Sequence, residues 1–112
     1  MWEFILDAVE ALFDFIDSVI SWIIDGLISL LEHVTNYFRG LKLKKGRDIP
    51  FIADQRKLGD IIHQAPQKNV GIFEGTYNED TNEIENYRLV EADGMSEDVK
   101  DLLGKEKLVV LT

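Results

Sequence analysis

The stretch that decides the fold is residues 1–38, MWEFILDAVEALFDFIDSVISWIIDGLISLLEHVTNYF. Polar residues recur in it every three or four positions, close to the 3.6 residues of an α-helical turn. Almost everything between these positions is large and apolar. The pattern predicts one long amphipathic helix with a narrow, mainly acidic stripe made of Glu3, Asp7, Glu10, Asp14, Asp17, Ser21, Asp25, Ser29, Glu32 and Asn36.

The apolar face of this helix is wider than a small core requires. A helix on a globular core needs an apolar stripe about 100° wide, and here apolar residues fill most of the arc outside the acidic stripe. A single helix over this stretch would also be about 55 Å long. Exposed apolar surface of that size is typical of a contact with another protein or a membrane. We therefore predict an assembly interface made of Trp2, Ile5, Leu12, Phe13, Ile16, Ile20, Ile23, Leu27, Leu30, Val34 and Phe38.

Gly26 leaves an alternative open within this segment. Glycine inside a helix is less favourable than alanine by about 1 kcal/mol, so the segment could instead be a hairpin of helices near residues 2–24 and 27–38. The polar spacing continues through Gly26 without a change of phase. That continuity favours the single helix.

The rest of the chain predicts a small α+β domain behind a basic linker. Gly40 is expected to end the helix over residues 1–40, residues 41–50 to form a basic linker and turn, and residues 51–112 to form the domain. Because this C-terminal part has its own apolar pattern and caps, we expect residues 41–112 to fold when made alone. The expected elements are a turn at Asp48–Pro50, a helix from Asp54 to about Ala65, a β-hairpin of Asn69–Tyr77 and Glu83–Glu91, a helix over Glu97–Leu103 capped by Ser96, and a terminal strand over Lys107–Thr112.

The fold class that these elements predict is α+β. A long amphipathic N-terminal helix would precede a three-stranded, mainly antiparallel sheet.

The charge and the composition of the chain disfavour two classes of partner. A formal net charge of −9 disfavours nucleic acid, because phosphate contact needs clustered Lys and Arg. A conventional transmembrane helix is disfavoured because acids such as Asp25 interrupt the apolar runs.

The sequence contains few patterns that are typical of catalytic, metal-binding or phosphate-binding sites. The chain has no cysteine, which excludes disulfides and thiolate metal sites. His33 and His63 have no ligand neighbour at metal spacing. The segment Gly71–Gly75 lacks the Lys and Ser/Thr of a phosphate-binding loop. The sequence therefore predicts no catalytic, cofactor-binding or metal-binding residue, no cofactor and no enzymatic activity.

The predicted function is that of a non-enzymatic, self-assembling structural protein. The N-terminal helices of several copies would pack into a multimeric core or filament, with the α+β domains outside, so the predicted partner is the chain itself. Two alternatives remain open. The chain could be a membrane-associated or pore-forming protein whose helices contact membrane lipid as an oligomer, or an adaptor that docks its helix on another protein. The sequence indicates no compartment.

Overall fold

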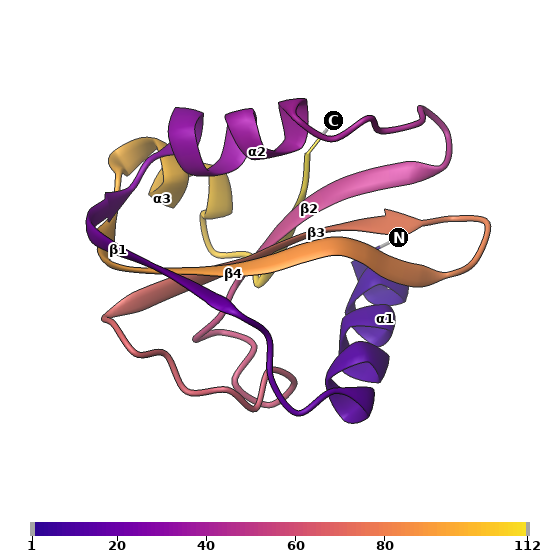
Figure 1. Ribbon diagram of the computed structural model, residues 1–112, viewed down its shortest axis with the longest axis horizontal. Coiled ribbons are helices and arrows are strands. Elements are labelled where there is room, and N and C mark those ends of the chain that lie inside the picture. The colour runs from indigo at the N-terminus through magenta and orange to yellow at the C-terminus, as the bar shows by residue number, and fades with distance from the viewer. Residues whose placement is uncertain (1, 112) are drawn as a thin grey trace.

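The N-terminal segment is divided between a helix and a strand. The computed structural model describes residues 2–111, with the side chain of Trp2 excepted, and it contains helix α1 (Trp2–Phe15) followed by strand β1 (Ser21–Ile28) (Figure 1). A π-helical segment, η1 (Leu30–Thr35), and a short helix, α2 (Asn36–Arg39), come next. The predicted long helix is therefore wrong, since α1 has 14 residues. The two-helix alternative is wrong as well, because Gly26 lies inside β1.

The composition of β1 explains this difference. Trp22, Ile23 and Ile24 are aromatic and β-branched, and such residues favour extended backbone. Gly26 has a φ of 100°, a conformation that glycine adopts at little cost and other residues avoid. The polar spacing continues through the segment because most side chains of β1 are at least partly exposed on both faces. The spacing therefore does not distinguish a helix from an exposed edge strand.

Five strands form one mixed sheet in the order β1-β4-β3-β2-β5. Antiparallel pairing joins β2 (Asp48–Asp54), β3 (Val70–Asn78), β4 (Glu83–Met95) and β5 (Leu108–Val110), whereas β1 pairs parallel with β4. The α+β class is confirmed. The predicted three-stranded sheet is too small, because the sequence assigned β1 to a helix and the start of β2 to a turn.

The elements with local signals lie close to their predicted positions. Strands β3 and β4 form the predicted hairpin. Helix α3 (Glu97–Leu103) follows Ser96, whose hydroxyl accepts a hydrogen bond from the Val99 N–H at 3.4 Å, and ends before Gly104. The predicted helix from Asp54 to Ala65 is wrong, since residues 55–61 form turns. Leu58 within them is still buried, as the apolar pattern requires.

The sheet is the middle layer of three and carries an apolar core on each face. Helix α1 covers one face, whereas η1, α2 and α3 cover the other (Figure 1). On the first face Val9 and Phe13 are buried against the sheet, and the Phe13 and Phe73 rings meet edge to face with centroids 5.3 Å apart. On the second face Val34 of η1 and Val99 of α3 are buried. Residues before position 40 thus contribute to both cores.

The predicted division into residues 1–40, 41–50 and 51–112 stays a prediction. The structure places parts of all three segments around one sheet, since β1 comes from the first segment and β2 begins at Asp48 in the second.

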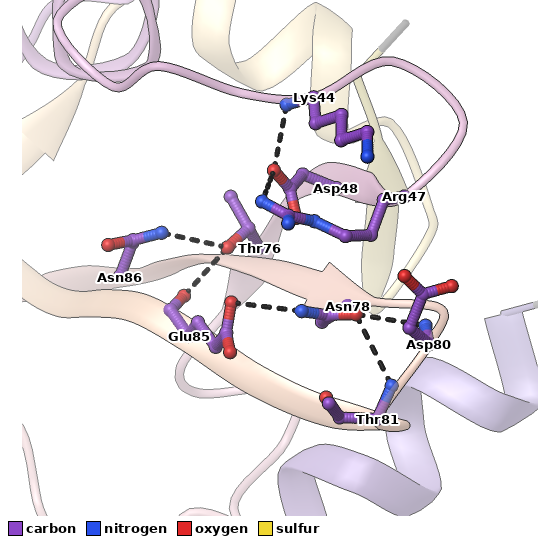
Figure 2. A network of polar contacts seen from close by, with 9 residues as sticks. All are labelled: Lys44, Arg47, Asp48, Thr76, Asn78, Asp80, Thr81, Glu85 and Asn86. Carbon is purple, nitrogen blue, oxygen red and sulfur yellow. Dashed lines mark hydrogen bonds and ion pairs between the residues drawn. The ribbon is translucent and has the colours of Figure 1, made fainter.

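Two residues of the basic linker form hydrogen bonds within the chain. The Asp48 carboxylate accepts hydrogen bonds from the Arg47 guanidinium at 2.9 Å and from the Lys44 N–H at 2.7 Å (Figure 2). These contacts, the one from Arg47 first, lower the pKa of Asp48.

Candidate association site at the sheet edge

Large apolar side chains are exposed along β1 and at the residue just before it. The exposed fractions are 83% for Ile20, 58% for Trp22, 45% for Ile23 and 57% for Leu27. We call these four residues the β1 surface. Strand β1 is at one edge of the sheet, so within the described residues no strand pairs with its outer side. Such an edge presents unpaired backbone N–H and C=O groups, which are a template for a further strand.

The two edges of the sheet differ in length and protection. At the opposite edge, β5 has only three residues, and very short edge strands are one way in which proteins prevent edge pairing. Strand β1 has eight residues, and Asp25 is the single charged residue among them. Neither lysine nor proline interrupts it. The β1 edge therefore lacks most of the features that block strand addition.

Trp22 is held at this edge by a stack of aromatic and guanidinium groups. The guanidinium carbon of Arg88 lies 5.2 Å from the centroid of the Trp22 ring and 4.0 Å from the centroid of the Tyr37 ring. The Arg88 Nη2 group also donates a hydrogen bond to the His33 carbonyl at 3.0 Å. Cation–π contacts of this kind are stronger where the cation is shielded from water. They connect β1, α2 and β4 across one face of the sheet.

A buried carboxylate fixes the same guanidinium from the other side. Glu74 is fully buried, and its Oε2 accepts a hydrogen bond from Arg88 Nε at 2.7 Å. Burial raises the pKa of Glu74 to about 7, and the nearby Arg88 opposes that rise. Among the described residues, the second oxygen, Oε1, has no hydrogen-bond partner. This pair is internal to the fold, and its effect at the edge is to hold Arg88 beneath Trp22.

A β-bulge gives Arg88 its position. Glu74 pairs with Arg88, whereas Thr76, two residues on, pairs with Glu85, so β4 has one extra residue between them. Asn86 in the bulge has a φ of 51°, which asparagine tolerates better than most residues. Its side-chain amide donates to Thr76 Oγ1 at 3.3 Å, and Thr76 Oγ1 donates to the Glu85 carbonyl at 3.0 Å (Figure 2). These contacts stabilise the local bend of β4.

Tyr37 connects α2 to that bulge. Its hydroxyl donates a hydrogen bond to the Asn86 carbonyl. Burial of the phenol is the largest cause that raises the pKa of Tyr37, with Glu74 adding to the rise and Arg88 opposing it. The phenol therefore serves as a hydrogen-bond donor, and α2 is fixed over the Arg88 guanidinium.

A pocket of about 750 Å³ opens beside the start of β1. Its lining includes Ile20 and Trp22 of the β1 surface together with Tyr87 of β4. Tyr87 is 36% exposed. The pocket thus extends the β1 surface with further apolar and aromatic lining.

The eleven residues predicted as an assembly interface fall into separate environments. Three are exposed at β1 and beside it, four are half-buried, three are buried inside the protomer, and the side chain of Trp2 lies outside the described part of the chain. Residues buried in their own chain cannot contact a second copy while the fold is intact. The exposed residues are Ile20, Ile23 and Leu27, the half-buried ones are Leu12, Ile16, Leu30 and Phe38, and the buried ones are Ile5, Phe13 and Val34.

Trp22 and Arg88 are missing from that predicted interface. The run Trp22–Ile24 is rich in strand-forming residues, and that signal could have identified Trp22 as an edge residue. The part played by Arg88 depends on pairing between strands far apart in the sequence, for which the chain carries no local signal.

Within residues 2–111, no helix is long and apolar enough to cross a membrane. In the same range, no group of three or more His, Cys, Asp or Glu residues is arranged to hold a metal ion. No family model, curated protein or solved structure matches this chain.

Proposed function

We propose that this protein is a non-enzymatic protein that associates with further copies of itself through the β1 surface. The observation that carries the proposal is an eight-residue edge strand that exposes Trp22, Ile23 and Leu27 beside unpaired backbone groups. A second strand placed on this edge would satisfy those backbone groups and cover the apolar side chains together.

The energetic drive comes from burying the β1 surface. A large apolar side chain that is fully removed from water contributes about 1.5–3 kcal/mol, and two copies bring eight partly exposed ones together. Association costs about 4–15 kcal/mol in lost translational and rotational freedom. The stack of Tyr37, Arg88 and Trp22 lowers the additional cost of ordering, because Trp22 is already positioned in the single copy.

The contact proposed here differs from a core of N-terminal helices. In α1, Val9 and Phe13 are buried against the chain's own sheet. The side of α1 that packs on the sheet is therefore unavailable to a second copy, and the large apolar residues that stay exposed on this helix, Phe4 and Phe15, lie eleven positions apart. Strand β1 follows α1 directly in the sequence and retains exposed apolar residues, so the proposed interface lies there.

The first prediction concerns oligomeric state. At micromolar concentration the parent chain is expected to have a mass greater than the 12.8 kDa of one copy. Ile23→Lys is expected to return it to 12.8 kDa, because a lysine on an edge strand opposes strand addition. Light scattering coupled to size-exclusion chromatography measures both masses.

The matched control is Leu31→Lys, which also removes an exposed apolar side chain, on η1 instead of β1. It is expected to keep the mass of the parent. A parent of 12.8 kDa would contradict self-association. Loss of association in Leu31→Lys but not in Ile23→Lys would move the contact away from β1.

A further inference from the structure

The regular part of the β1 edge is short and well defined. Residues Ser21–Ile24 pair continuously with Leu89–Ala92 of β4, and the register shifts before Leu27. On the N-terminal side, the backbone N–H and C=O of Val19 are both bonded to the side-chain amide of Gln64, at 2.8 and 2.9 Å. Val19 is therefore tied to its own chain. An added strand has to be centred between these two limits.

Symmetry restricts where two β1 strands can meet. A two-fold axis perpendicular to the sheet maps each face onto itself, so residues opposite one another across the axis must share a face. Trp22 lies on the face of Arg88, whereas Ser21 lies on the other face, where Gln64 Nε2 donates to its hydroxyl at 3.0 Å. Successive residues of a strand point to opposite faces, so two residues that lie opposite one another must be an even number of positions apart in the sequence. The axis therefore lies level with one residue and not at the midpoint between two neighbouring residues. The candidates are Trp22, Ile23 and Ile24.

We propose that two copies join β1 to β1 in antiparallel orientation about a two-fold axis at Ile23, a proposal that rests on the self-association proposed above. The two five-stranded sheets then become one continuous sheet across the interface. Ile23 lies opposite itself, Trp22 lies opposite Ile24, and Ser21 lies opposite Asp25. Apolar residues therefore lie opposite apolar residues on both faces of the sheet, and the Asp25 carboxylate lies opposite the Ser21 hydroxyl, which can donate a hydrogen bond to it.

The two other registers are less favourable. An axis at Trp22 places Ser21 opposite Ile23 twice, which sets each hydroxyl against an apolar side chain, and it moves the added strand one residue nearer to Val19, whose backbone is already bonded to Gln64. An axis at Ile24 places Asp25 opposite Ile23 twice, which sets each carboxylate against an apolar side chain. The axis at Ile23 avoids both conflicts, and it keeps Ser21–Asp25 of each copy within β1.

Charge is compatible with this arrangement. Asp25 forms an ion pair with Lys68 of its own chain, with 3.1 Å between Oδ1 and Nζ. In the proposed register the Asp25 residues of the two copies are offset by four residues along the strands, or about 13 Å. That separation exceeds the Debye length of about 8 Å at physiological ionic strength. Although the chain is acidic overall, the proposed register therefore does not bring the two Asp25 carboxylates close together.

The pocket beside β1 extends the contact. In the proposed register the strand of the second copy runs toward Val19 and Ile20, and the exposed Leu27 of the second copy approaches the pocket of about 750 Å³ that Ile20, Trp22 and Tyr87 line. Each copy supplies one Leu27 and one pocket. The contact is isologous and closes at two copies.

Single cysteines test the register, since the natural chain has none. Directly opposite residues of antiparallel strands have Cα atoms about 4.5–5.5 Å apart, within the range of about 4.4–6.8 Å that disulfides span. Under mild oxidation, full-length Ile23→Cys is expected to become a covalent dimer on a non-reducing gel. Trp22→Cys is expected to stay monomeric on that gel, because its two copies are diagonal neighbours about 7–8 Å apart.

A mixing experiment provides the second readout. Ser21→Cys and Asp25→Cys, each alone, are expected to give no covalent dimer, whereas their mixture is expected to give one. Reduced Ile23→Cys must keep the thermal unfolding profile of the parent, which separates a change of register from a loss of folding. Leu31→Cys, exposed on η1, serves as the collision control and is expected not to cross-link.

The outcomes separate this register from self-association itself. A parent chain that is monomeric in light scattering overturns both proposals. A parent chain that associates while Trp22→Cys or Leu31→Cys cross-links in preference to Ile23→Cys overturns the register and leaves self-association standing. Cross-linking of Ile23→Cys and of the Ser21→Cys with Asp25→Cys mixture, without cross-linking of the controls, supports the Ile23 axis.

Discussion

A chain reduced to residues 41–112 is expected to show no cooperative unfolding transition. The truncation removes α1 and β1, and with them Val9, Phe13 and Ile28, each at most 6% exposed in the full chain. Each such side chain contributes about 1.5–3 kcal/mol on burial. Together with the lost β1–β4 pairing, the deficit is comparable to the whole stability of a small protein, about 5–15 kcal/mol.

Thermal unfolding followed by circular dichroism measures this outcome, with the full chain under the same conditions as the control. The truncated chain is expected to give a gradual, featureless profile and to bind a hydrophobic dye. This expectation replaces the one drawn from the sequence, by which residues 41–112 would fold alone. A sharp transition in the truncated chain would contradict the shared cores and support the predicted division near residue 40.

Arg88→Met is expected to destabilise the fold by about 3–5 kcal/mol at about pH 8, and by less at about pH 5. The substitution leaves the fully buried Glu74 carboxylate without the guanidinium that now lies 2.7 Å away. At the higher pH this carboxylate is ionised in the parent, since the pKa of Glu74 is about 7. At the lower pH it is protonated, so removal of the cation costs less.

Glu74 also contributes to the pH dependence of the parent's stability. Folding raises the pKa of Glu74 from its ordinary 4.5 to about 7, so between these values the folded state binds more protons than the unfolded state. The contribution of Glu74 to stability is therefore greatest below about pH 4.5 and falls as the pH rises toward 7. Over that window the decline corresponds to about 3 kcal/mol.

Urea unfolding at several pH values between about 5 and 8 tests both statements. Glu74→Gln is expected to flatten the pH dependence, whereas Glu83→Gln, an exposed acid on the same strand as Arg88, is expected to leave it nearly unchanged. Equal flattening by the two variants would assign the slope to general charge repulsion. An Arg88→Met chain as stable as the parent at pH 8 would show that the buried pair is dispensable.

The sequence predicts elements that carry local signals. Helix α3 has a capping serine and a following glycine, Ser96 and Gly104, and the β3–β4 hairpin surrounds a polar turn. Strand β1 has no comparable signal. Its partner β4 lies more than 60 residues further along the chain, as the pairing of Ser21 with Leu89 shows, and such a pairing depends on tertiary structure that a local pattern does not contain.

The site could be predicted only in part for a related reason. A helical projection treats every apolar residue between the acids as one face, so it includes Ile5 and Val34, which the folded chain buries. The same projection includes Ile23, which is exposed. Exposure at β1 depends on its position at the edge of the sheet, and that position is a property of the sheet order rather than of residues 21–28.

Hydrogen exchange of β1 tests self-association through this strand most directly. Backbone amides on the free edge exchange rapidly in a single copy and become protected when a second strand accepts their hydrogen bonds. Mass spectrometry at two protein concentrations, below and above the onset of association, follows a peptide covering residues 21–28 and a reference peptide covering residues 108–110. The account predicts slower exchange in the β1 peptide at the higher concentration and no change in the reference. Equal exchange in the β1 peptide at both concentrations, while light scattering reports association, would contradict it.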